Sequence, residues 1–271
     1  MRHVRSLAGE PALLARYRAA CPDEEHRPTS EATATWDAFR TDQSAYVELL
    51  DSLAAAQQGL CVYCEQRLVD DTGALIPNDY QVEHVQAKSG AKGRVLDWHN
   101  LALACTGGTY PHHEDRTRYQ SGQNRSCGQT KASDDLPQGC DPRTFPLLDA
   151  LVEVGMDGRL SVNAQHCVQA GVASKNIEDA IKLLNLDCER LRKARQDRRD
   201  NVSLWLVPLL RVLLDGTHLG AEQRQQMFEL LIEGRLRPDV FGCLRAFWST
   251  ERSALGPGAE AWISSKQVLF T

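Results

Sequence analysis

Four of the nine cysteines have a spacing that could hold a single metal ion. Cys61 and Cys64 lie in the segment LCVYCEQ, where a gap of two residues lets both thiolates face one point, as one edge of a zinc tetrahedron requires. Cys105 and Cys127 are the candidates for the second pair, although 21 residues separate them. A long insertion between two ligands adds loop entropy only slowly, whereas metal binding contributes on the order of 10 kcal/mol. The four cysteines therefore predict a structural zinc site.

Two other interpretations of these cysteines stay open. A redox CxxC motif normally follows a strand and opens a helix at its first cysteine, whereas here a helical pattern that ends at Gly59 precedes Cys61. The four thiols could also be incidental. The remaining cysteines are spread along the chain without pairing, which indicates small core residues in a reducing compartment. They are Cys21, Cys140, Cys167, Cys188 and Cys243.

A carboxylate and an imidazole lie side by side in the segment DYQVEHVQAKSG, at the end of a short strand-like run. The ordinary pKa of histidine, near 6.5, makes His84 a suitable general base for activating water. Glu83 offers the oxygen ligand that Mg²⁺ or Mn²⁺ prefers. Adjacent residues of a regular strand point to opposite faces, so the two can serve one site only where the strand ends or twists. We expect that change at residues 86–94, which contain two glycines; the alternative is a core histidine beside a surface carboxylate.

The charge of the whole chain differs from the charge around this segment. The formal net charge is −5, which argues against a general attraction to polyanions. Residues 86–131 instead carry seven Lys or Arg against three acidic residues, so a nucleic-acid backbone could bind there. Lys88 and Lys131 are the candidates for phosphate contact, with solvated surface lysines as the alternative.

The elements that must position these residues divide the chain into three predicted parts. Residues 1–59 contain stretches with apolar residues at helical spacing, and residues 60–135 have the short strands and turns of a small metal-braced unit. Residues 136–271 begin with a proline-containing linker, continue with a hairpin across Asp157 and Gly158, and end in helices. The predicted fold class is therefore α+β and mainly helical.

Two features of the C-terminal helices could meet a partner. The basic residues of segment 190–199 are expected to form a solvated face more than a binding surface. Trp248 and Trp262 are candidate exposed anchors, unless both pack within the helices. The chain has no run of 18 apolar residues, and its start, MRHVRSLAGE, lacks the pattern of a signal peptide. The expected location is the cytoplasm, without a membrane.

Several of the segments named above resemble the HNH nucleases. The pieces that carry the resemblance are VEHVQAKS, DWHNLALAC and SCGQTK. That family has a ββα-metal motif with a first histidine, a central asparagine and a final histidine or asparagine, often braced by four zinc-binding cysteines. The resemblance implies a zinc-braced ββα unit in which His84 is the base, Glu83 binds the catalytic cation, and Asn100 orients the turn that aims His84.

The sequence departs from the family pattern at one position. The final ligand normally follows the last cysteine, and here that residue is Gly128, which has no side chain to bind a metal. Either the catalytic cation has one protein ligand fewer, or His112, His113 or Asn124 takes the place of the missing ligand. Of these three, His113 is the one that we assign to the catalytic cation. A non-catalytic HNH domain is the other possibility.

Segments outside the motif are similar to PtuB-type HNH proteins, which occur in Septu and retron antiphage systems. These segments are GLCVYCEQRL, DPRTF, DGRLSV and IKLLNLDCERLRKAR, and the resemblance covers residues 1–199. It implies an endonuclease that cleaves nucleic acid, DNA more than RNA, with Mg²⁺ or Mn²⁺, beside a PtuA-type ATPase of the ABC/SMC-like class. The alternative is a non-catalytic zinc module that binds nucleic acid or another protein.

Overall fold

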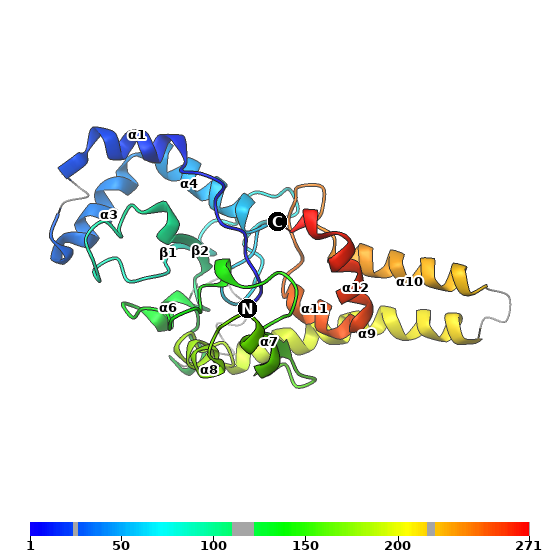
Figure 1. Ribbon diagram of the computed structural model, residues 1–271. Coiled ribbons are helices and arrows are strands. Elements are labelled where there is room, and N and C mark those ends of the chain that lie inside the picture. The colour runs from blue at the N-terminus through cyan, green and yellow to red at the C-terminus, as the bar shows by residue number, and fades with distance from the viewer. Residues whose placement is uncertain (24–26, 110–121, 216–219, 271) are drawn as a thin grey trace.

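The N-terminal part of the chain is helical and packs around one long helix. The structure, a computed structural model, describes residues 1–23, 27–109, 122–215 and 220–270. Asp42 begins the long helix as its N-cap, because its carboxylate accepts a hydrogen bond from the amide of Ala45 at 3.1 Å. The elements of this part are α1 (Ala12–Ala20), the 3-10 turn η1 (Thr29–Glu31), α3 (Ala32–Thr41) and α4 (Gln43–Ala56). α1 and α3 both pack against α4 (Figure 1).

The middle part contains two antiparallel strands followed by a short helix. β1 (Tyr80–His84) pairs with β2 (Leu101–Cys105), and the register sets Tyr80 opposite Cys105 and His84 opposite Leu101. The 3-10 turn η2 (Trp98–Asn100) leads into β2, and α6 (Gly128–Lys131) follows Cys127. α4 packs on β2, so the strand pair lies against the N-terminal helices. The order of the elements is the predicted β, β, α.

The C-terminal part starts with a small hairpin and ends in helices. β3 (Val152–Val154) and β4 (Leu160–Val162) pair antiparallel, which confirms the hairpin predicted across Asp157 and Gly158. Gly158 has a φ of +73°, a conformation that glycine adopts without strain. The remaining elements are η3 (Gly122–Asn124), η4 (Pro142–Thr144), α7 (Ala164–Gln169), α8 (Ser174–Leu183), α9 (Glu189–Asp215), α10 (Ala221–Leu236), α11 (Trp248–Leu255), α12 (Pro257–Ser265) and η5 (Gln267–Leu269). Figure 1 shows α9 and α10 projecting side by side away from the rest of the molecule.

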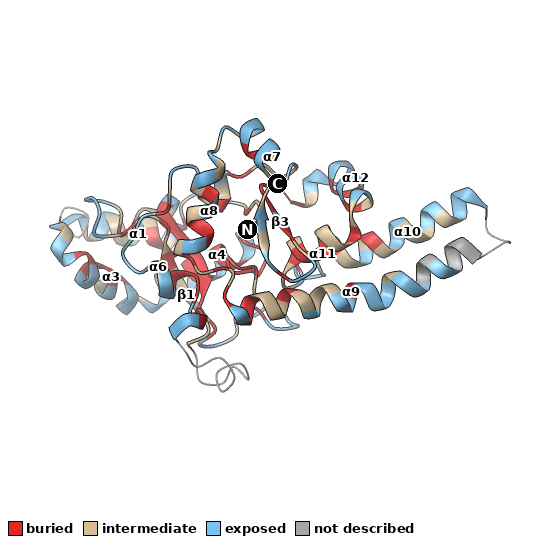
Figure 2. Ribbon diagram, turned by 90° about the horizontal axis from the view of Figure 1, so that it is seen from below, coloured by how far each residue is buried: buried red, intermediate tan, exposed pale blue. Residues whose placement is uncertain are grey.

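The buried residues form two clusters. The larger one joins the N-terminal helices, the strand pair and α8, and the smaller one lies among α9 to α12. Figure 2 shows the buried residues concentrated around β1, α4 and α6, while the described residues of α9 and α10 that lie away from the body of the molecule are mostly exposed. Of the described helices, none is both long and apolar enough to cross a bilayer.

Two expectations about the C-terminal helices are corrected. Trp248 and Trp262 belong to the smaller buried cluster, with 1% and 7% of their surface exposed, so neither is an exposed anchor. Arg190 and Arg195 are also buried rather than part of a solvated face. Their guanidinium groups donate to Ser126, Gly158, Leu186 and Asp187, which compensates for the loss of water.

Candidate metal centre and active site

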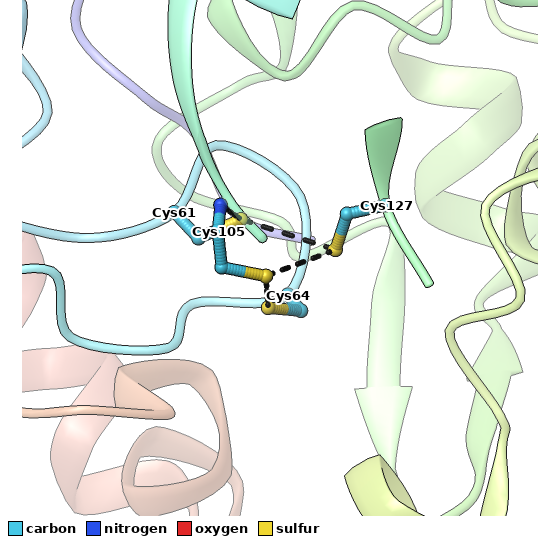
Figure 3. A group of neighbouring side chains, drawn as sticks. All are labelled: Cys61, Cys64, Cys105 and Cys127. Carbon is cyan, nitrogen blue, oxygen red and sulfur yellow. Dashed lines mark hydrogen bonds between the residues drawn. The ribbon is translucent and has the colours of Figure 1, made fainter. Parts of the chain in front are cut away.

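The four cysteines from the CxxC pair and its distant partners meet at one point (Figure 3). Their sulfur atoms are 3.6 Å apart for Cys64 and Cys105, 3.7 Å for Cys105 and Cys127, and 3.9 Å for Cys61 and Cys127. A tetrahedron with Zn–S bonds of about 2.3 Å separates its sulfurs by about 3.8 Å. All four side chains are buried and free of disulfides. The group could therefore hold a zinc ion.

The backbone around each cysteine explains the convergence. The knuckle turns at Glu65, which has a φ of +66° and donates its amide to the carbonyl of Cys61 at 3.2 Å. Cys105 ends β2, and its amide donates to the sulfur of Cys61 at 3.2 Å. The amide of Cys127 donates to the carbonyl of Leu184 at 2.8 Å, which fixes the fourth ligand against the end of α8. A two-cysteine redox motif gives no reason for Cys105 and Cys127 to join the pair.

Arg190, at the start of α9, lies behind the cysteine group. Its Nη2 donates to Ser126 Oγ at 2.7 Å, and its backbone amide donates to Asn124 Oδ1 at 3.1 Å. Burial opposes the charge of this side chain, but the negative charge of the Cys105 and Cys64 sulfurs in their thiolate form outweighs that effect and raises the pKa of Arg190. A positive charge at this place would offset the negative charge of four thiolates around Zn²⁺.

Glu83 and His84 both line one cavity of 410 Å³ beside the cysteine group. His84 is the last residue of β1, so the chain can turn away from the regular strand at this point. Lys88 and Gly128 line this cavity as well. The two residues that the sequence proposes for the chemistry therefore line the same cavity.

The contacts of His84 define which nitrogen can accept a proton. Its Nε2 lies 2.9 Å from the carbonyl oxygen of Val95, and a carbonyl can only accept, so Nε2 carries the hydrogen and Nδ1 keeps its lone pair. The ring meets Trp36 of α3 edge to face, with centroids 4.8 Å apart. Burial lowers the pKa of His84 to about 4, so the imidazole is neutral at pH 7.

Glu83 is held by two buried partners. Lys131 Nζ lies 3.1 Å from its Oε1, and the hydroxyl of Tyr63 donates to the same oxygen at 3.3 Å. Burial raises the pKa of Glu83, and the ammonium of Lys131 opposes that rise. Tyr63 stands between the cysteines of the CxxC pair, so the proposed zinc knuckle also supports this carboxylate.

Lys131 has a different position from the one that the sequence predicts. It is fully buried, and its ammonium also donates to the carbonyl oxygens of His84 and Asp134 at 3.0 Å each. The sequence places this lysine one helical turn beyond Cys127, but the burial of α6 directs it inward to Glu83. In this arrangement Lys131 neutralises the carboxylate and does not face a phosphate.

Asn100 closes the loop between β1 and β2. Its Oδ1 accepts from the amide of Gln86 at 2.8 Å, and its Nδ2 donates to the carbonyls of Gln86 and Arg94 at 2.9 and 3.1 Å. Both ends of the loop are therefore tied together, and Val95, whose carbonyl holds His84, comes directly after Arg94. Lys88 lies inside the loop and is half-buried.

Gly128 stands where the final HNH ligand is expected. A Cβ atom at this position would lie 2.2 Å from Oε2 of Glu83, so the carboxylate itself occupies the space of a ligand side chain. Asn124 does not line the cavity, and its side chain caps α9 instead. His112 and His113 lie outside the described residues.

Two contributors to this site carry no recognisable signal in the sequence. Trp36 comes from a helix far from the motif, and the Val95 contact is made by a backbone carbonyl, which any residue type supplies. Tyr63 could have been noticed, because a residue inside a CxxC turn must lie near the metal.

A comparison with curated proteins finds one clear relative, and no protein-family model matches the chain. The relative is named "Retron Ec83 putative HNH endonuclease" and comes from Escherichia coli. The two are 28% identical over an alignment of 188 residues, and the alignment covers 60% of this chain and 69% of the relative. The chain resembles an HNH endonuclease. This similarity supports an HNH endonuclease family, in agreement with the ββα order and with the four cysteines beside the strands.

Proposed function

We propose that the protein is an HNH endonuclease that hydrolyses phosphodiester bonds of nucleic acid, DNA more than RNA. The observation that carries the proposal is that Glu83 and His84 open into one cavity beside four converging cysteines. The similarity to an HNH endonuclease supports the same conclusion. Zn²⁺ would be structural, held by Cys61, Cys64, Cys105 and Cys127, and Mg²⁺ or Mn²⁺ would bind at Glu83.

Each residue has a role that follows from its contacts. The Nδ1 of neutral His84 accepts a proton from the attacking water, while the Val95 carbonyl and Trp36 fix the ring. When bound, the divalent cation would neutralise charge on the phosphate and the leaving oxygen. Glu83 would be its ligand, and Asn100 positions the loop that holds His84. His113 is proposed as a further ligand, and Lys88 as a phosphate contact.

The test compares wild-type protein with His84→Ala and Glu83→Gln on plasmid DNA, single-stranded DNA and RNA, with Mg²⁺, Mn²⁺ or EDTA. Loss of a general base typically slows a reaction by about 10² to 10⁴. His166→Ala is a matched control, because that half-buried histidine also bonds a backbone carbonyl, at 3.0 Å, but lies outside the cavity. Equal cleavage by His84→Ala and wild type would refute the assignment of the base.

We further propose that the protein is the effector of a PtuB-type antiphage system and acts in the cytoplasm with a PtuA-type ATPase. The resemblance to PtuB-type proteins and the retron origin of the relative support this proposal. The surface proposed for the ATPase is the projecting pair α9 and α10, which exposes Leu204, Trp205 and Leu230. Co-purification of the ATPase with wild type but not with Trp205→Ser/Leu230→Ser is the expected result. Co-purification of the ATPase with both wild type and the double variant would show that the ATPase binds a different surface.

A second candidate is a zinc module that binds nucleic acid without cleaving it. The feature that favours this candidate is Gly128, which lacks a metal-binding side chain. Binding of DNA or RNA together with the absence of cleavage in Mg²⁺, in Mn²⁺ and with the ATPase would support it. A protein-interaction module would bind neither nucleic acid.

A further inference from the structure

The cavity of Glu83 and His84 is not closed by the HNH unit alone. One wall comes from the start of α3 and the preceding turn η1, which contribute Thr29, Ser30 and Thr33. A second hollow of about 10 Å³, a narrow slot, adjoins the cavity, and the two share Thr29, Ala32 and Lys88 in their walls. We call the two together the α3 cleft. The turn η1 and the start of α3 therefore border the proposed active site.

The α3 cleft has the chemistry of a phosphate-binding surface. Arg27, Lys88 and Lys92 line the slot. Among the described residues that line either hollow, Glu83 is the one acidic residue, and it is already paired with Lys131. Hydroxyl groups surround the cavity on both sides; they belong to Thr29, Ser30, Thr33, Ser89 and Ser133. Phosphate oxygens accept hydrogen bonds from such hydroxyls and attract the cations.

Polar groups at the start of the helix are also available. No side chain caps η1 at Pro28, so the amides of Thr29 and Ser30 have no side-chain cap, while the amides of Glu31 and Ala32 donate to the carbonyls of Pro28 and Thr29. Thr35 is one of the residues that line the slot; it is 1% exposed, and its buried hydroxyl has no hydrogen-bond partner within the described part of the chain. The partial positive charge of a helix start favours an anion at this place.

We propose that the α3 cleft binds the nucleic-acid backbone next to the cleaved bond, with Lys88, Lys92 and Arg27 on the phosphates and the hydroxyls of the α3 wall beside them. The proposal rests on the proposed endonuclease function and adds a substrate path that runs outside the HNH unit. Arg27 also lies 3.9 Å from Glu31, in an exposed ion pair of the kind that contributes little to stability.

Binding is measured in the His84→Ala background with EDTA, so that cleavage does not interfere. Anisotropy of a fluorescent DNA oligonucleotide, single-stranded or duplex, is recorded over a range of NaCl concentrations. Each lost phosphate contact reduces the slope of log affinity against log salt by about 0.7 for single strands or about 0.9 for duplex. Lys88→Gln/Lys92→Gln should therefore reduce the slope by about 1.4 to 1.8. The control pair Lys182→Gln/Lys266→Gln removes the same charge at exposed positions of α8 and the C-terminus and should leave the slope unchanged.

A second pair of variants tests the wall itself. Thr33→Glu places a carboxylate in the cleft and should weaken binding at least tenfold, whereas Ala34→Glu adds the same charge at the next, exposed position outside both hollows and should have little effect. Equal affinities for these two variants, or equal salt slopes for the two lysine pairs, would refute the proposal that the α3 cleft binds nucleic acid. The proposed nuclease function would not be affected by that result. Failure of the His84→Ala protein to bind either the DNA oligonucleotides or a labelled RNA of the same length would overturn both.

Discussion

At the scale of single residues, Glu83 and His84 are neighbours in the chain but depend on different surroundings. Glu83 is buried against Lys131 and Tyr63, while His84 is fixed by Val95 and Trp36. A buried carboxylate without its cation is costly, because the low dielectric of the interior penalises an unpaired charge. Burial raises the pKa of Glu83, and the ammonium of Lys131 opposes that rise, so this pair favours the ionised carboxylate that a cation ligand requires.

Replacing Lys131 tests this pairing. Lys131→Met leaves Glu83 buried without its counter-charge and should lower the free energy of unfolding by about 3 to 5 kcal/mol. Lys131→Met/Glu83→Gln should be less destabilised than Lys131→Met, because the uncompensated charge is gone. Urea unfolding followed by circular dichroism measures both. Lys175→Met is the control, since Lys175 pairs with Asp179 on the surface and its loss should matter much less. A double variant as unstable as Lys131→Met would contradict the pairing.

The buried imidazole should make stability depend on pH. The pKa of His84 is lowered to about 4, so between about pH 6.5 and about pH 4 the unfolded chain binds a proton that the folded protein does not. Stability therefore falls as the pH decreases through this window. From about pH 7.5 to about pH 5.5 wild type should lose about 1 kcal/mol more than His84→Gln. Urea unfolding without Mg²⁺ at both pH values checks this, and identical losses would show that the ring titrates normally.

At the scale of elements, the site is assembled from pieces outside the ββα unit. α3 contributes Trp36 and the wall of the cleft, and α9 begins with Arg190 behind the cysteines. Partners behind metal ligands commonly tune metal affinity. The first turn of α9 should for this reason influence the proposed zinc site although none of its residues is a ligand.

Arg190→Met is the variant that tests α9. Loss of the positive charge beside four thiolates should weaken zinc binding by about 10- to 100-fold, measured by competition with a chromogenic chelator. Arg190→Lys should retain part of the affinity because the charge stays. Lys193→Met, three residues along the same helix and paired with Asp197, is the matched control and should bind zinc as wild type does. Equal zinc affinities for all three variants would show that Arg190 does not influence zinc binding.

At the scale of the whole molecule, the cysteine group connects parts that are distant in the chain. It ties the knuckle after α4 to the end of β2 and, through Cys127 and Leu184, to α8. The larger buried cluster contains all four cysteines together with residues of α1, α4 and α8. Metal binding here would therefore stabilise the body of the protein and the active site at once.

Removal of zinc should weaken both stability and activity. Purified protein is expected to contain one zinc per chain, and Cys105→Ser or Cys127→Ser should lose the metal and have a lower Tm. Cys140→Ser alters a buried thiol outside the group and should keep the metal. Zinc is measured by atomic emission and Tm by calorimetry. Full zinc content in Cys105→Ser would exclude the four-thiolate site.

The sequence alone predicted the local features well, and the reason is that each depends on residues near one another in the chain. The strand that ends at His84, the hairpin across Asp157 and Gly158, and the mainly helical character follow from periodicity and turn residues. The choice of Cys105 and Cys127 came from the chemistry of a tetrahedron, which needs a second pair.

Burial and the direction of long side chains were decided only by tertiary packing. Lysine, tryptophan and arginine can lie at a surface or inside a protein. Whether Lys131, Trp248 and Arg190 are buried depends on partners far away in the sequence, such as Glu83 for Lys131. The same holds for Trp36 over His84 and for the cleft made by α3. Spacing along a chain can show which residues could share a metal, whereas only the packed structure shows which side chains share a cavity.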